Sequence, residues 1–142
     1  GRGIVGDMLR DAENGIMRVI GTGENHWPLV YDRDLADLYV RLVTSPEARG
    51  IYHATDDTAL TVGEIAAAIA AHAQQRPDIR FMPLAEARAK MGPYADALAL
   101  DQVVRSPRAR ALGWQPTLGS IVNNVPRLFE EWRNARTEDR AS

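Results

Sequence analysis

The chain has 142 residues and a formal net charge of −2, with 45% hydrophobic and 25% charged residues, which is the composition of one ordinary globular domain. The small net charge gives no general attraction to nucleic acid, and no apolar run reaches the ~18 residues that a membrane span needs. Because cysteine is absent, disulfides, thiol catalysis and cysteine-bound zinc are excluded, and a cytoplasmic location is expected.

The first six residues, GRGIVG, have the G-x-G-x-x-G spacing of a dinucleotide-binding loop, and an acid that could support this role follows at Glu24. That loop works only where a buried strand leads into its first glycine and a helix leaves its last one. Nothing precedes Gly1 in this sequence. The spacing alone is therefore weak support for a dinucleotide-binding loop at residues 1–6, and the family resemblance described below implies a crossover and the start of a helix there instead.

Helical and strand patterns alternate along the chain and predict an α/β or α+β fold. The first part is expected to contain a helix at 4–14, a strand at 16–21, a strand at 27–31 that Pro28 confines to a sheet edge, a helix at 34–44 and a strand at 50–56. Asp34 is expected to be the N-cap of the helix at 34–44, where its carboxylate would accept hydrogen bonds from the first-turn amides.

The second part begins with Thr61 and Glu64, which form a T-x-x-E capping box before a helix at 61–73. A strand at 78–84 and helices at 84–91, 106–112 and 120–135 are expected to follow. Gly113 would end the helix at 106–112, with Trp114 folding back onto it. Pro126 predicts that the last helix kinks or restarts near Asn124, and residues 136–142 are expected to be a frayed tail.

Lysine occurs once, at Lys90. A P-loop Gly-Lys pair is therefore impossible. Glu86 stands four residues before Lys90, so the chain also has no Tyr-x-x-x-Lys pair, which is an acid/base unit of dehydrogenases.

Four motifs in a fixed order resemble one family. The segments are GTGENHWPLVYDRDLADLYVRLV, GIYHATDDTALTVGEIAAAIA and LALDQVVRSPRARALGWQPTL, followed by the closing amphipathic helix. In this order they resemble the C-terminal half of the extended short-chain dehydrogenase/reductases, the NAD-dependent epimerase/dehydratases. The resemblance runs from about residue 1 to 132 and implies that residues 1–135 are a substrate-binding domain.

The resemblance also implies what lies outside this chain. The family's cofactor loop, its Ser/Thr and its Tyr-x-x-x-Lys belong to an N-terminal Rossmann half, and GRG resembles the end of a VYG-[RP]-G segment that follows that half. NAD or NADP is thus implied for a full-length protein, whereas this chain is expected to bind neither and to carry no catalytic residue.

Candidate substrate-binding residues follow from one departure from the family pattern. Sugar-nucleotide members carry R-D-[FY] at the start of the strand where this chain has Trp27, Pro28 and Leu29. An indole in place of a bidentate guanidinium favours a small uncharged substrate such as a sugar lactone, a ketone or an aldehyde, unless Arg105 or Arg108 supplies the clamp. Trp27 is either a cleft residue or part of the core, and His26 either binds substrate or is solvated.

Other polar and flexible positions have alternative interpretations. Met91 and Tyr94 flank Gly92-Pro93 and form either a mobile lip over the substrate or an ordinary helix–helix turn. Asp56-Asp57 and Glu130-Glu131 are expected to be solvated. His53 and His72 have no partner at metal-binding spacing, so no metal site is expected. Three classes of function stay open: part of an oxidoreductase or epimerase, an NAD(P)-sensing regulator of the same fold, and a free-standing interaction domain.

Overall fold

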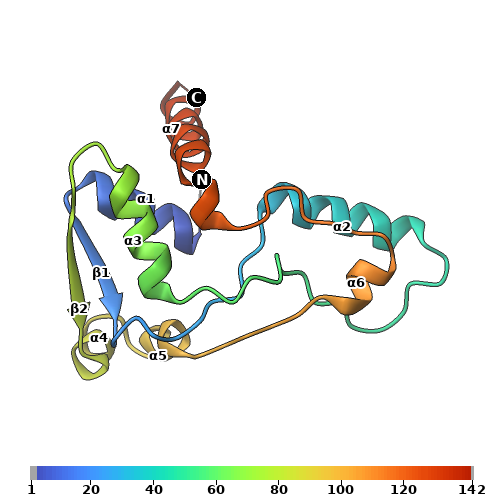
Figure 1. Cartoon of the computed structure of the whole chain (residues 1–142), viewed down its shortest axis with the longest axis horizontal. Coiled ribbons are helices and arrows are strands. Elements are labelled where there is room, and N and C mark those ends of the chain that lie inside the picture. The colour runs from blue at the N-terminus through green and yellow to red at the C-terminus, as the bar shows by residue number, and fades with distance from the viewer. Residues whose placement is uncertain (1–2, 142) are drawn as a thin grey trace.

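The computed structural model describes residues 3–141 and has a mixed α/β fold, as expected from the sequence (Figure 1). The elements are α1 (Ile4–Glu13), β1 (Ile16–Ile20), α2 (Asp32–Thr44), α3 (Val62–His72), β2 (Asp78–Met82), α4 (Leu84–Met91), α5 (Tyr94–Ala99), α6 (Pro107–Ala111), the 3-10 helix η1 (Ile121–Asn123) and α7 (Val125–Ala141). None of the helices in this part of the chain has the length and apolar run that crossing a membrane requires.

Most elements gather into one part of the molecule, which we call the body (α1, β1, α3, β2, α4, α5, η1 and α7; Figure 1). Strands β1 and β2 pair in parallel, with Ile16 opposite Asp78 and Ile20 opposite Met82. Apolar residues from α1, β1, α3, η1 and α7 form its main core, which includes Met17, Ile65 and Phe129. These elements are helical or extended where their apolar periodicity predicted them.

The second part, which we call the arm, consists of α2, α6 and residues 45–57 and 101–118 (Figure 1). Trp114 is fully buried here, among Leu38 of α2 and Ala109 of α6. As expected, Gly113 ends α6 with φ 79°, and the Trp114 amide donates to the Ala109 carbonyl at 3.2 Å. The arm therefore depends on one small apolar cluster, whereas the body has a larger core.

The capping box at the start of α3 is confirmed. The Glu64 amide donates to Thr61 Oγ1 at 3.1 Å, and the Thr61 amide donates to Glu64 Oε2 at 2.8 Å. These two bonds satisfy amides that have no partner inside the helix. They also fix the direction in which α3 enters the main core.

Replacing Thr61 with alanine is expected to lower the free energy of unfolding by about 1 kcal/mol, the usual cost of losing an N-cap side chain. Urea denaturation followed by circular dichroism measures this change. Thr44→Ala is the matched control, because the Thr44 hydroxyl caps no helix start and donates back to the Val40 and Arg41 carbonyls on an exposed part of α2. Equal losses in the two variants would contradict a capping role.

Two expected strands did not form as strands. Residues 27–31 and 50–56 belong to no strand, and they meet through the bond from the Asp56 amide to the Leu29 carbonyl at 2.8 Å. Pro28 has no amide to donate, and neither segment has a continuous neighbour on which a ladder of bonds could form.

The C-terminal helix restarts where Pro126 predicted, because η1 ends at Asn123 and α7 begins at Val125. Helix α7 runs to Ala141, so the backbone of residues 136–141 is helical where the sequence suggested a frayed tail. Gly1, Arg2 and Ser142 lie outside the described residues. Helix α1 starts at Ile4, which agrees with the expected helix start within GRGIVG.

Asp34 is not an N-cap. Helix α2 begins two residues earlier, with Tyr31 at the N-cap position and no side-chain cap. The Asp34 carboxylate instead accepts hydrogen bonds from Thr117 N–H at 2.9 Å, Thr117 Oγ1 at 2.7 Å and Leu118 N–H at 3.2 Å, and the residue is 3% exposed. It joins α2 to the loop after α6.

One member of each acidic pair, Asp57 and Glu131, is not simply solvated, whereas Glu130 is exposed as expected. The Asp57 carboxylate accepts from the Ser106 amide and hydroxyl, both at 2.8 Å, and pairs with Arg110. Asp57 also has a φ of 62°, which is unusual for a residue other than glycine. Glu131 accepts from the Tyr31 hydroxyl, whose oxygen lies 2.9 Å from both carboxylate oxygens. These carboxylates are held by residues far away in the sequence.

Candidate functional site

The segment Asn25–Trp27, which contains two of the expected substrate-binding residues, is held against residues 98–102. Asn25 Nδ2 donates to the Leu98 carbonyl at 3.0 Å and to the Leu100 carbonyl at 3.1 Å, and Trp27 Nε1 donates to the Leu98 carbonyl at 2.9 Å. The Gln102 amide donates to the His26 carbonyl at 3.1 Å. Bonds from backbone and side chains together fix the end of α5 next to this segment.

His26 is paired with an acid. Its amide and its ring Nδ1 both lie within hydrogen-bond distance of Asp101 Oδ1, at 2.9 Å and 2.7 Å. The bond from the His26 amide, followed by that of the ring, lowers the pKa of Asp101 below its usual range, so Asp101 is ionised at neutral pH. An aspartate on Nδ1 orients the imidazole and leaves Nε2 as the nitrogen that can meet a ligand.

Trp27 packs on the core, which is one of the two alternatives that the sequence left open, and its contact with a substrate stays a prediction. Its indole packs against the main core, and its Nε1–H donates to the Leu98 carbonyl. The residue as a whole is only half-buried. The indole is therefore an anchor for the segment 98–102 and keeps a face at the surface. Any contact with a substrate would use that apolar face and not the N–H group.

Met91 and Tyr94 lie on either side of a real turn between α4 and α5. Gly92 closes α4 with φ 65°, and Met91 and Tyr94 are 40% and 57% exposed. Lys90, in the last turn of α4, forms an ion pair with Glu86 at 2.6 Å. Tyr94 precedes Leu98 by four residues in α5, so the turn lies about one helical turn from the Trp27 contact.

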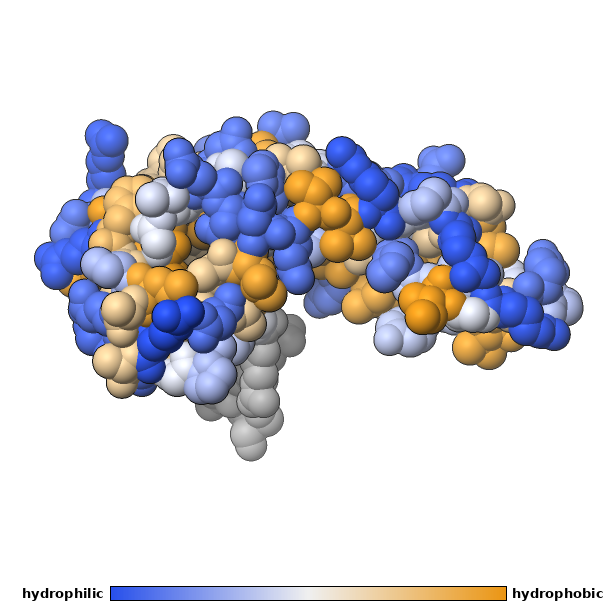
Figure 2. All heavy atoms as spheres, turned by 90° about the horizontal axis from the view of Figure 1, so that it is seen from below, coloured by the Kyte–Doolittle hydropathy of each residue, from blue (hydrophilic) through white to orange (hydrophobic). Residues whose placement is uncertain are grey.

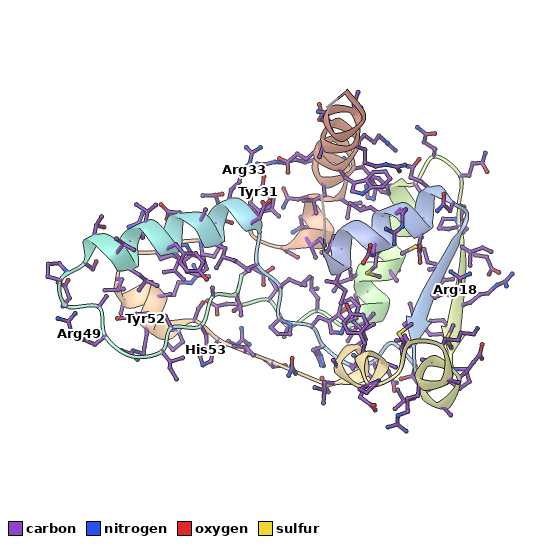
Figure 3. The ribbon with its side chains drawn as sticks, turned by 180° about the vertical axis from the view of Figure 1, so that it is seen from behind. Arg18, Tyr31, Arg33, Arg49, Tyr52 and His53 are labelled. Atoms are coloured by element: carbon purple, nitrogen blue, oxygen red, sulfur yellow. The ribbon has the colours of Figure 1, made fainter. Side chains whose placement is uncertain are left out.

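The arginines considered as a phosphate clamp are used within the arm. Arg105 donates to the Asp57 carbonyl, and Arg108 donates to the Ile51 carbonyl at 2.8 Å and to the Arg49 carbonyl. The Arg108 guanidinium also stacks 4.5 Å from the centre of the Tyr52 ring, and Figure 3 shows Tyr52 and Arg49 on this part of the molecule. Both arginines therefore have their partners on the arm, and neither is bonded to Trp27.

A cavity of about 370 Å³ lies elsewhere, between the start of α1, residues 29–33, the loop at 118–121 and α7. None of the four expected substrate-binding residues lines it. Tyr31 lies at its polar edge, beside the start of α7 (Figure 3). The sequence analysis did not single out Tyr31 or Glu131 for this site, and the only local signal was the i, i+4 pair of Arg127 and Glu131.

Tyr31 and Glu131 form a fixed pair at this edge. The Tyr31 hydroxyl lies 2.9 Å from both Glu131 carboxylate oxygens, and Arg127 donates to the same two groups. Burial, together with the bond to Glu131 and its negative charge, raises the pKa of Tyr31, which stays a neutral phenol. Burial alone would raise the pKa of Glu131, but bonds from Arg127 and Tyr31 outweigh it and lower that pKa.

No cluster of three or more acidic or histidine side chains suited to a metal ion occurs among the described residues. His53 lies on the arm (Figure 3), and the His72 ring Nδ1 lies 2.9 Å from the Ala68 carbonyl.

No family model matches the sequence. An uncharacterized protein of Schizosaccharomyces pombe is 31% identical over 122 residues, a match that covers 83% of this chain and 40% of that protein. Among solved structures, the human epimerase family protein SDR39U1 with NADPH matches with a TM-score of 0.76 at 24% identity, over 92% of this chain and 44% of that one.

Two further structures match in the same way. Pal from Bacillus thuringiensis has a TM-score of 0.72 at 21% identity and covers 95% of this chain. The epimerase Mth375 from Methanothermobacter thermautotrophicus has a TM-score of 0.72 at 18% identity and covers 96% of it. The chain shares its fold with part of these proteins. It spans only 40% to 44% of their lengths and 40% of the curated relative.

Proposed function

We propose that this chain is the substrate-binding part of an NAD(P)-dependent epimerase, dehydratase or reductase that acts on a small, uncharged, sugar-like or carbonyl substrate. The observation that carries this proposal is the fold shared over 92% of the chain with an epimerase family protein solved with NADPH. The chain itself has no Tyr-x-x-x-Lys pair. The cofactor and the acid/base chemistry would therefore come from a separate cofactor-binding half.

The substrate would lie against the surface formed by His26, Trp27, Met91 and Tyr94. The apolar face of Trp27 would pack on the substrate, and His26 Nε2 would hydrogen-bond a hydroxyl or carbonyl group. No arginine stands at residues 27–29, where the sugar-nucleotide members carry R-D-[FY], and Arg105 and Arg108 are engaged in the arm. This distribution of charge supports an uncharged substrate.

Exposed apolar side chains on the arm support the proposal that a cofactor-binding half packs against this chain. Tyr39, Val40 and Val43 on α2 are 63%, 62% and 85% exposed, and Ile51 is 75% exposed. Figure 2 shows apolar residues at the surface of both the arm and the body. A face of this kind on a helix is typical of a surface that another domain covers.

Replacing Trp27 with alanine, in a polypeptide that joins this chain to its cofactor-binding half, is expected to raise KM for the small substrate by about tenfold without changing cofactor affinity. Trp27→Phe is the control, because it keeps an apolar aromatic face while it loses the N–H bond to Leu98 and part of the ring area. Nicotinamide absorbance measures redox turnover, and a coupled assay is needed for epimerisation, which causes no net redox change.

Two results would contradict the proposal. Efficient turnover of UDP-, GDP- or dTDP-sugars, with little on uncharged compounds, would exclude the proposed substrate class. Micromolar binding of NADPH to the 142-residue chain alone, measured by titration calorimetry, would exclude the division of roles between the two halves.

A further inference from the structure

We propose that the cavity between α1, α7 and residues 29–33 is a separate binding site for a small uncharged molecule with a ring-sized apolar body and one hydroxyl group. The cavity volume of about 370 Å³ lies within the range of ligand sites, roughly 300–1,000 Å³. The proposal concerns this chain alone and does not depend on the cofactor-binding half.

The inner walls of the cavity are apolar and firmly held. Leu9, Ile121 and Trp132 line it and are also buried members of the main core, with 3%, 4% and 6% exposure. Val5, Leu29 and Leu128 complete these walls and pack against the same core. A ring of carbon atoms would find a preformed apolar surface here, so little ordering of the protein would be needed.

The polar groups lie along one edge and are also held in place. Tyr31 and Glu131 are fixed by their mutual bonds and by Arg127. An ionised carboxylate offers about four lone-pair positions, so Glu131 keeps the capacity to accept one more donor. A hydroxyl group is the donor that suits this position without bringing a charge into the cavity.

The charges around the cavity favour a neutral ligand. Asp32, Arg33, Asp56 and Glu131 line the cavity, and Arg127 pairs with Glu131 from outside the lining, so these five side chains carry a formal net charge of only −1. An anion would meet excess negative charge. A cation would lose its hydration and gain little attraction in exchange. Glu131 is already paired with Arg127, and Asp56 Oδ1 accepts from the Thr58 amide and hydroxyl.

Three probes with the same ring test the ligand class: cyclohexanol, cyclohexylammonium and cyclohexanecarboxylate. Each is titrated into the isotope-labelled chain, and the methyl resonances of Val5, Leu9, Leu29 and Ile121 are followed by NMR. Cyclohexanol is expected to shift these methyls with a saturating, millimolar Kd, and the two ions are expected to bind at least about tenfold more weakly.

A larger side chain placed in the cavity tests whether the probe binds there. Ala135 lines the cavity from α7, so Ala135→Phe is expected to abolish the methyl shifts. Asn134→Phe is the matched control, because Asn134 is the exposed neighbour on the same helix and should leave binding unchanged. Should Ala135→Phe not fold by circular dichroism, Tyr31→Phe replaces it, and a several-fold weaker Kd for cyclohexanol is expected.

Three outcomes would overturn the proposal. The first is tighter binding of either ion than of cyclohexanol. The second is a set of shifts that lies away from the cavity walls. The third is unchanged binding in folded Ala135→Phe. None of them bears on the proposed epimerase or reductase activity, which is tested at Trp27 and in a longer polypeptide.

Discussion

Replacing Trp114 with alanine is expected to destabilise the arm by about 4 kcal/mol, within the range of large-to-small changes at buried aromatic residues. The side chain is fully buried, and its Nε1 donates to the Asp34 carbonyl at 2.8 Å. Among the described residues, Leu38 and Ala109 are the other buried members of its cluster, and Val30, Leu42, Tyr52 and Ala54 pack against it partly buried. The void would therefore lie at the centre of a small cluster, most of whose other members are only partly buried.

Hydrogen exchange by mass spectrometry is the measurement for this variant, because it separates the arm from the body. Amides of α2 and α6 are expected to exchange faster, while those of α3 and β1 keep most of their protection. Trp114→Phe keeps an aromatic ring but loses part of the buried indole and the bond to Asp34, so its cost is expected to be about 2 kcal/mol. Equal loss of protection in arm and body would show that the two parts unfold together.

Replacing Asp34 with alanine is expected to cost about 3 kcal/mol. The change removes the acceptor of three hydrogen bonds and leaves the Thr117 and Leu118 amides without their partner. Asp37→Ala is the matched control on the same helix, because Asp37 forms only an exposed ion pair with Arg41 and should cost about 0.5 kcal/mol. Chemical denaturation of both variants gives the two values, and similar values would contradict the prediction.

The contribution of Asp34 is expected to depend on pH. Burial by itself raises the pKa of this carboxyl, but the bonds from Thr117 and Leu118 outweigh burial, and the pKa lies below its ordinary value. A lowered pKa in the folded state means that the stabilisation is present at neutral pH and is lost as the pH falls below about 4. The difference in unfolding free energy between wild type and Asp34→Ala should therefore shrink between pH 7 and pH 3.

The features that the sequence predicted correctly depend on neighbouring residues. The capping box of Thr61 and Glu64, the end of α6 at Gly113 and the restart of the last helix near Pro126 each involve residues within a few positions of one another. Backbone geometry over such short distances is set by local sterics and hydrogen bonds. Local sequence is therefore sufficient to predict them.

The features that the sequence did not predict depend on distant partners. Asp34 looked like an N-cap because acids are common at that position, but its bonds go to residues more than 80 positions away. Residues 27–31 and 50–56 have the composition of strands, and whether a strand forms depends on a neighbour that composition does not reveal.

In the candidate site, too, the sequence indicated single residues and not the distant partners that they contact. Trp27 was singled out by its departure from a family pattern and His26 as its neighbour, yet their attachment to Leu98 and Asp101 crosses more than 70 positions. The cavity edge was missed because Tyr31 and Glu131 are 100 positions apart. Sequence patterns indicated which residues are chemically notable, but the fold determines which of them meet.

The single lysine gives the chain an unusually simple surface chemistry. Lys90 is 57% exposed in its side chain and stands directly before Met91 at the turn between α4 and α5. An amine-reactive fluorophore therefore has one side chain to modify, and a lysine-specific endoproteinase has one peptide bond to cleave, after Lys90. Emission from the label, or the rate of that cleavage, would report the motion of this turn in the unmutated protein, with no engineered cysteine.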